Sequence, residues 1–310
     1  MTSVCVPLVC WLLLAPQGQA VEPVEPVVPI GIWYAGPGAQ PPGSPAGDLD
    51  VVRGDLAAIR RAGFNSITTW ITWGEAEPKR SGYAFAAAER LIAAAAQADL
   101  RVDVRVFVAP VPAWSSDVQA DRARFVDYAS TRLRLAPNVM SVEATESPEA
   151  PPRPIRVGKG ARTPVDARLD FWSAIARGAQ RVMFMDAGGG AGPAVLSLGE
   201  TVGIVTRNQA LFAPLSPREA GVRGVTGASG APVDVKLLES ADALMILALN
   251  HSPAPQRVTI EFAADIPEAI WQNLETGAAV NFVMGKSGPF VEHTFAPRDA
   301  LVLMIRKKLR

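Results

Sequence analysis

Apolar runs of strand length alternate with helical patterns along the N-terminal part of the chain. The predicted strands are apolar runs bounded by turn residues, and they cover Pro29–Gly36, Phe64–Trp73, Leu100–Pro110, Asn138–Glu146 and Arg181–Gly188. Apolar residues recur at helical spacing in Asp48–Ala62, Ala86–Ala98, Arg122–Leu135, Asp166–Gly178 and near Arg207–Phe212. Strands and helices that alternate at intervals of about thirty residues are typical of βαβ units. The pattern therefore predicts an α/β domain with a parallel sheet or barrel over residues 21–220.

The hydrophobic pattern changes near Gly221. Residues 221–231 are rich in Gly, Ala, Pro and Ser, which predicts a linker between two domains. Beyond it, short segments with β-type patterns are separated by turn residues, as in VDVKLLES, ALMILALNHS, QRVTIEFA and ALVLMIRK. Such segments are typical of an antiparallel sandwich. We therefore expect an independent all-β sandwich domain over residues 232–310.

The first twenty residues have the pattern of a secretory signal peptide. Their apolar core from Val4 to Ala15 is too short to span a bilayer as a helix, and small residues follow at a plausible cleavage site. The segment before the core carries no Lys or Arg, so a misassigned start codon or a buried apolar strand remains an alternative. We expect residues 1–20 to be removed and the mature protein to begin near Val21, secreted or periplasmic and without a transmembrane segment.

Composition excludes several classes of function. The formal net charge is +0, which argues against nucleic acid as a partner, because phosphates call for a basic face. Both cysteines, Cys5 and Cys10, lie in the predicted signal peptide, so the mature chain would lack disulfides and cysteine ligands. The two histidines, His251 and His293, are too few for a histidine-based metal site. We expect neither a metal nor a cofactor.

Fixed aromatic and turn positions near the start of the chain indicate a family. They are Gly63-Phe64-Asn65, Trp73, Glu77-Pro78, Gly82, Tyr83, Phe85 and Pro112-Ala113-Trp114. This block resembles the first strands of the β-galactosidases of glycoside hydrolase family 42 and their relatives. A later stretch, DFWSAIARGAQRVMFMDAGG, resembles the last helix and strand of the same barrels. VMSVEATESP resembles their seventh strand, whose terminal Glu is the nucleophile; this implies Glu143 in that role, or Glu146 if the register slips.

The chain departs from this family in the middle of the barrel. Such enzymes have eight strands, but between Trp114 and Val139 the sequence has room for a single helix. The family's fourth strand ends in Asn-Glu, the general acid/base. The acids of this interval are only Asp117, Asp121 and Asp127, and none follows Asn. We therefore predict an incomplete (β/α) TIM-type barrel.

Retaining glycoside hydrolysis needs two carboxyl groups about 5–5.5 Å apart. Glu143 is the nucleophile candidate, and a strand-end Glu paired with Arg is the alternative for it. Asp186 and Asp117 are candidates for the second carboxyl by position only, with loop capping as the alternative. Sugar rings stack on aromatic planes, so we expect a substrate cleft lined by strand-end aromatics; packing in the core or at the rim is the other interpretation. These aromatic residues are Trp33, Tyr34, Trp73 and Trp114.

The sequence predicts a secreted glycoside hydrolase-like protein that acts on β-galactosides or related oligosaccharides by a retaining mechanism. The absent Asn-Glu favours two alternatives. One is a catalytically inactive carbohydrate-binding pseudoenzyme that lacks the general acid/base. The other is a truncated gene product that folds poorly.

Overall fold

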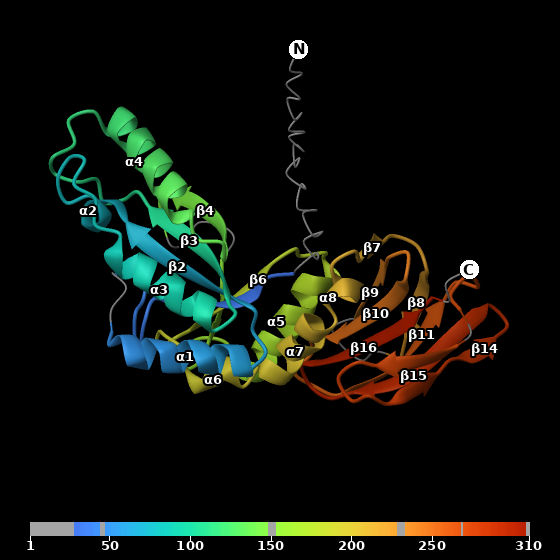
Figure 1. Cartoon of the computed structure of the whole chain (residues 1–310). Coiled ribbons are helices and arrows are strands. Elements are labelled where there is room, and N and C mark those ends of the chain that lie inside the picture. Colours follow the sequence, from blue (N-terminus) through green and yellow to red (C-terminus); the bar gives the residue numbers. More distant parts are fainter. Residues whose placement is uncertain (1–27, 44–46, 148–152, 228–232, 268, 308–310) are drawn as a thin grey trace, which may run out of the picture.

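The computed structural model describes residues 28–43, 47–147, 153–227, 233–267 and 269–307. The predicted signal peptide, both cysteines and Val21 lie outside these residues. In the described part, every helix is too short or too polar to cross a membrane. An α/β unit and an all-β unit lie side by side, with a group of helices between their sheets (Figure 1).

The N-terminal unit is built on a parallel sheet of six strands. Their bounds are β1 Ile30–Trp33, β2 Ser66–Thr72, β3 Arg101–Phe107, β4 Val139–Thr145, β5 Ile155–Val157 and β6 Val182–Asp186. The strand order is β4-β3-β2-β1-β6-β5, with every neighbouring pair parallel. All seven residues of β2 are buried, as in a strand covered on both faces. The predicted parallel sheet is confirmed, but among the described residues no ladder joins β4 to β5, so the barrel is not shown to close.

The strand expected to be the seventh of a barrel lies elsewhere. β4 pairs with β3, with Glu143 opposite Arg105. The strand beside β6 is instead β5, a three-residue strand in a segment predicted to be a loop. The assignment of Asn138–Glu146 to the seventh position is therefore wrong. A right-handed crossover through the single helix after β3 brings the next strand to the neighbouring position, whatever its sequence resembles.

Helices cover the parallel sheet, and three of them, Trp73–Ala76, Pro193–Leu196 and Gly199–Arg207, lie where no helix was predicted. Their bounds are α1 Leu49–Arg61, α2 Trp73–Ala76, α3 Ala86–Gln97, α4 Val118–Leu133, α5 Pro164–Ala176, α6 Pro193–Leu196, α7 Gly199–Arg207 and α8 Gln209–Phe212. In α1, Val52, Leu56 and Ile59 are buried at helical spacing. The Asp48 side chain caps the helix by accepting a hydrogen bond from the backbone amide of Asp50. The helix ends before Gly63, whose φ of 99° favours glycine.

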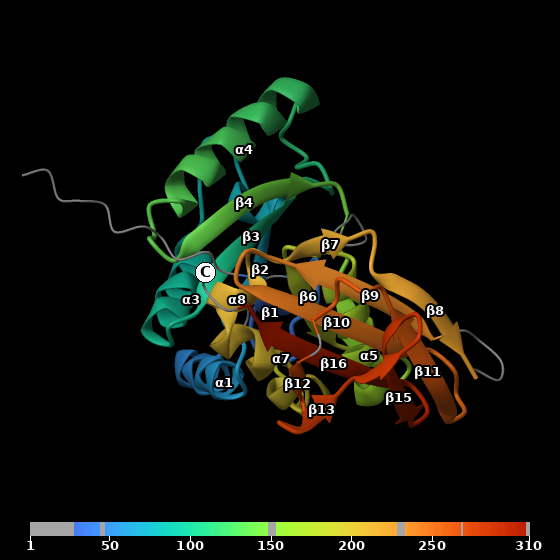
Figure 2. The same ribbon diagram turned by 90° about the vertical axis from the view of Figure 1, so that its right-hand side faces the viewer.

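The C-terminal unit is a sandwich of two antiparallel sheets, ordered β13-β12-β16-β10-β9-β7 and β14-β15-β11-β8 (Figure 2). The bounds are β7 Ser216–Arg218, β8 Val222–Thr226, β9 Asp234–Glu239, β10 Ala243–Asn250, β11 Gln256–Phe262, β12 Ile270–Asn273, β13 Ala279–Asn281, β14 Val283–Gly285, β15 Gly288–Phe295 and β16 Asp299–Arg306.

The predicted linker is wrong for part of its length. Residues 222–226 form β8, an edge strand that pairs with β11, and β7 already belongs to the larger sheet. The sandwich therefore begins near Ser216 rather than at 232, while 228–231 lie outside the described residues. Glycine is common in linkers, but it also occurs where a strand bends or bulges. Gly221 has φ 131° and precedes a shift in the β8–β11 register.

The larger sandwich sheet is buried on both faces. Along β10 the odd positions from Ala243 to Leu249 join the core around the parallel sheet, whereas the even positions from Leu244 to Ala248 join the sandwich core. α5 contacts β9, β10 and β16, so this helix packs between the two units. The two units therefore share one continuous core, and α5 covers one face of the larger sandwich sheet.

Candidate functional site

Glu143 lies on the face of the sheet that also presents Trp70 and Arg105, since parallel partners at one register level point the same way. Its Oε2 is 2.6 Å from Nη1 of Arg105, and its Oε1 is 3.5 Å from Nη1 of Arg181. The side chain of Glu143 is 42% exposed, whereas that of Arg105 is 7% exposed. The nucleophile candidate is therefore a carboxylate held by two guanidinium groups, within β4 rather than beyond its end.

A second carboxyl, Asp103, lies close to Glu143. Arg181 bridges the two, with Nη2 at 3.2 Å from Oδ1 of Asp103, and the Ser141 hydroxyl donates to the same oxygen. Asp103 is 1% exposed, and its Oδ2 has no hydrogen-bond partner in the described structure. Burial raises the pKa of Asp103 against the opposing effects of Ser141 and Arg181, and the charge of Glu143 raises it further.

Asp103 was not among the residues predicted from the sequence. The signal was present in LRVDVRVFVAP, where Asp103 and Arg105 alternate with valines. In a strand this spacing places both charges on one face, which is the face that a barrel would enclose.

The other acidic candidates have local roles. Glu146 follows β4, is exposed and pairs with Arg122. Asp186 ends β6, is buried and accepts a 2.8 Å hydrogen bond from the Gly188 amide, so it caps the glycine-rich loop. Asp117 caps the N-terminus of α4 through the amide of Ala120 at 3.1 Å. Among the described contacts, none of these three carboxyls joins the Glu143 cluster.

Three of the four predicted sugar-stacking aromatics are buried. Trp33 packs on Trp70 with ring centroids 5.9 Å apart. The Tyr34 hydroxyl donates to Asp55 at 2.8 Å, and its pKa is raised by burial and by that carboxylate. Trp73 is fully buried and stacks on Phe125. These residues form part of the core and present no open face to a sugar, so packing, the alternative interpretation, describes them.

Trp114 is half-buried and belongs to a polar cluster around Glu77. Its indole N–H donates to the Glu77 carbonyl at 2.8 Å, and Arg124 lies over its ring. The Glu77 carboxylate is fully buried and is 2.8 Å from Nη1 of Arg124. It also accepts from the Trp73 indole at 3.0 Å and from the Ser81 amide at 2.7 Å. Glu77 therefore fixes the turn after α2.

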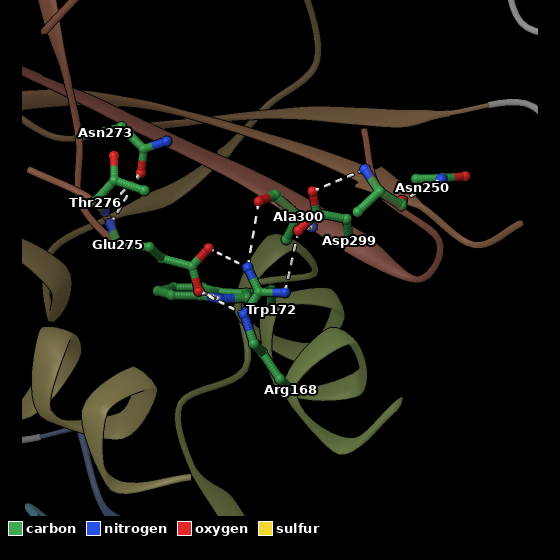
Figure 3. Close-up of polar contacts among 9 residues, drawn as sticks. Arg168, Trp172, Asn250, Asn273, Glu275, Thr276, Asp299 and Ala300 are labelled. Carbon is green, nitrogen blue, oxygen red and sulfur yellow. Dashed lines mark hydrogen bonds and ion pairs between the residues drawn. The ribbon is translucent and has the colours of Figure 1, made fainter. Parts of the chain in front are cut away.

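A pocket of about 890 Å³ lies between the helices of the N-terminal unit and the sandwich. Figure 3 shows its polar wall, where Arg168 of α5 binds the carboxylate of Glu275 and, at 3.3 Å, that of Asp299. The Trp172 indole donates to Glu275 at 2.9 Å. Burial opposes the charge on Arg168, but Glu275 and Asp299 raise its pKa overall. This network connects α5 to the sandwich and gives the pocket a fixed wall.

The remaining wall of this interdomain pocket carries polar side chains from α7 and β15. Glu200, Thr201 and Arg207 come from α7, and none of their side chains has a hydrogen-bond or ion-pair partner within the described residues. His293 of β15 completes this wall; burial lowers its pKa despite the charge of Asp299, which favours a neutral imidazole. A carboxylate, a hydroxyl, a guanidinium and an imidazole around one pocket suit a polyhydroxylated ligand. The described residues contain no cluster of three metal-binding side chains.

Comparisons with known proteins place the fold but not the family. No family model matches the chain, and no curated protein matches it in sequence. An α-amylase from Geobacillus thermoleovorans, solved with acarbose, is similar at 10% identity and a TM-score of 0.58, over 90% of this chain and 98% of that chain. A family 5 glycoside hydrolase from Bacteroides vulgatus is similar at 11% identity and 0.55, over 91% and 90%.

A family 30 endoxylanase from Clostridium papyrosolvens is also similar, at 9% identity and a TM-score of 0.52, over 91% of this chain and 97% of that chain. The chain thus has a glycoside hydrolase-like fold. These matches support no assignment to family 42 in particular, which the resemblance in sequence had implied.

Proposed function

We propose that this protein binds carbohydrate on a glycoside hydrolase-like fold and does not hydrolyse it through Glu143. The observation that carries the proposal is the neutralisation of Glu143 by Arg105 and Arg181. A retaining nucleophile must reach the anomeric carbon while a second carboxyl protonates the leaving oxygen. Here the carboxyl nearest in the network, Asp103, is buried and shares Arg181 with Glu143. The arrangement balances charge inside an open parallel sheet.

The interdomain pocket is the site at which we propose that carbohydrate binds. Its volume of about 890 Å³ falls in the range of small-ligand sites. Hydroxyl groups of a sugar both donate and accept hydrogen bonds, which matches the mixture of Glu200, Thr201, Arg207 and His293 in the wall. We propose β-galactosides or related oligosaccharides as the class of ligand.

Calorimetry with galacto-oligosaccharides tests the binding proposal. Thr201→Val removes one hydroxyl at nearly constant shape, so the affinity should fall by about fivefold to tenfold. The matched control is Thr131→Val on the exposed surface of α4, which should leave the affinity unchanged. Wild-type protein that binds no oligosaccharide, or equal affinities in both variants, would contradict binding at this pocket.

One observation favours hydrolysis as a second candidate function. Burial raises the pKa of Asp103, which shares Arg181 with Glu143, and a carboxyl whose pKa is raised by burial is typical of acid/base sites. In this mechanism Glu143 attacks the anomeric carbon, and Asp103 gives its proton to the departing oxygen. Water then hydrolyses the glycosyl ester, and Asp103 recovers the proton.

An aryl galactoside and a natural disaccharide distinguish the two functions. If the carboxyls form a catalytic pair, Glu143→Gln abolishes turnover of both substrates. Asp103→Asn should then spare the aryl substrate, whose leaving group barely needs protonation, and added azide should accelerate that reaction. If the protein only binds carbohydrate, wild type cleaves neither substrate but still binds the disaccharide in calorimetry.

A further inference from the structure

A second pocket, of about 500 Å³, lies where strands of the parallel sheet begin. Its wall includes an arginine from each of four elements: Arg60 lies in the last turn of α1, Arg101 begins β3, Arg207 ends α7 and Arg306 ends β16. In Figure 2 the end of β16 points toward α7 and α8, which line the same pocket. Four guanidinium groups from distant parts of the chain therefore surround one hollow, which we call the arginine pocket.

The arginine pocket has an excess of positive charge. Arg60 is 2.7 Å from Asp99, which is the one acidic side chain of the lining. For Arg101, Arg207 and Arg306, the described part of the chain supplies no carboxylate within ion-pair distance. Elsewhere, arginines that face a cavity or the core do have such partners, as Arg105 and Arg168 do. Three like charges around a hollow repel one another unless an anion lies among them.

Of the three arginines without a carboxylate partner, Arg207 and Arg306 are exposed. Arg101 is only partly exposed at the start of a central strand. The guanidinium of Arg207 lies across Gly203, where a Cβ atom would come within 2.5 Å of Nη1. A residue larger than glycine at 203 would thus displace Arg207 without removing its charge. Gln209 adds an amide to the lining, and guanidinium and amide groups together suit an oxyanion.

Arg207 also lines the interdomain pocket, so the two pockets adjoin. We propose that the arginine pocket binds the anionic substituent, a sulfate ester or a uronate carboxylate, of an acidic oligosaccharide. The polyhydroxylated part of the same ligand occupies the interdomain pocket. This inference rests on the proposed function and specifies its ligand: an acidic rather than a neutral saccharide.

The test compares four probes by calorimetry on the full chain: a neutral agarose-derived tetrasaccharide, a sulfated carrageenan-derived tetrasaccharide, trigalacturonic acid and inorganic sulfate. At least one acidic saccharide should bind about tenfold more tightly than the neutral one, since charge-assisted hydrogen bonds are the stronger kind. The arm that gains identifies the sulfate ester or the carboxylate. Raising the salt concentration should reduce this advantage.

Variants separate the arginine pocket from general electrostatics. Arg101→Gln and Arg306→Gln should each remove most of the advantage of the acidic saccharide and leave the affinity for the neutral one unchanged. Gly203→Ala moves Arg207, which lines both pockets, so this variant should lower the affinity for the neutral saccharide as well as for the acidic one. The control is Arg134→Gln at the exposed end of α4, which changes the net charge equally and should have no effect. Circular dichroism verifies that each variant is folded.

Each outcome has one meaning. An advantage that depends on Arg101 and Arg306 supports the inference. Equal affinity for neutral and acidic saccharides overturns it and leaves the proposed function standing. If inorganic sulfate binds in an arginine-dependent way but no saccharide binds, both the saccharide ligand and the proposed function are wrong. An advantage that Arg134→Gln reduces as much as Arg101→Gln also overturns the inference, because the effect would then come from net charge.

Discussion

Replacing Glu77 with Gln should destabilise the protein more than any other single change of a carboxylate to an amide considered above. The Glu77 carboxylate is fully buried, and one of its oxygens accepts from both Arg124 and the Ser81 amide. The other oxygen accepts from the Trp73 indole. Gln keeps one oxygen, which can still accept from Ser81. Its NH₂ group, however, would face the indole N–H, so that two donors meet inside the core.

The magnitude follows from these contacts. A hydrogen bond to a charged group contributes about 1.5–3 kcal/mol, and removing one partner of a buried ion pair costs about 3–5 kcal/mol. The Arg124 side chain is 33% exposed, so water partly compensates the loss of its partner. We therefore expect Glu77→Gln to lower the free energy of unfolding by about 3 kcal/mol.

Glu89→Gln is the matched control. Glu89 of α3 pairs at 2.7 Å with Arg132 of α4, the helix that also carries Arg124, but these side chains are 38% and 49% exposed. An exposed pair contributes less than about 1 kcal/mol. Urea unfolding followed by tryptophan fluorescence measures both variants, and Trp73 and Trp114 report on the Glu77 cluster itself. Equal losses in the two variants, or a loss below about 1 kcal/mol for Glu77→Gln, would refute this account of the turn.

Three further predictions concern the parallel sheet and the N-terminus. Gly31→Ala should unfold the protein or cost several kcal/mol, because a Cβ there would lie 2.3 Å from the Ser66 carbonyl oxygen. The control Gly54→Ala, at an exposed position of α1, should stabilise the protein by up to about 1 kcal/mol. Thermal melts measure both variants. The raised pKa of Asp103 means that its contribution to stability is present at low pH and is lost as pH rises through its folded-state value. Asp103→Asn should thus gain stability relative to wild type from about pH 4 upward, and an advantage that shrinks over this range in urea titrations would contradict the burial argument. Export predicts a mature terminus near Val21, and intact Met1 on soluble cytoplasmic protein would exclude it.

Hydrophobic periodicity identified five of the six strands of the parallel sheet and the helices α1, α3, α4 and α5, but not the nine-residue helix α7. Continuous apolar runs became strands of a parallel sheet, and apolar residues at helical spacing became helices. Pairing was harder to predict. β4 was assigned by resemblance to a position beside β6, whereas a single connecting helix leaves it beside β3. The three residues of β5 are too few for any periodic signal. Short strands and strand neighbours depend on the whole chain, which a local pattern does not encode.

The candidate site was predicted less well than the fold. Resemblance to the seventh strand of the family 42 barrels implied Glu143, but its two arginine partners come from β3 and from the residue before β6, far away in sequence. The aromatic residues at strand ends were expected to face a ligand. Rings as large as Trp33 and Trp73 also lose most by exposure to water, and the structure buries them. The interdomain pocket is lined by residues of α7 and β15, and no sequence motif predicts that these two elements lie together.

The apolar pattern of β10 indicates that the larger sheet of the sandwich is covered on both faces. ALMILALN is apolar at consecutive positions, whereas a strand with one solvated face alternates. Its odd residues pack toward α5 and its even residues toward the other sandwich sheet. The sandwich thus covers apolar surface of α5, a helix that also packs on the parallel sheet. This shared core fixes α7 against β15 and keeps the two adjoining pockets in shape, so any ligand that binds there depends on both units at once.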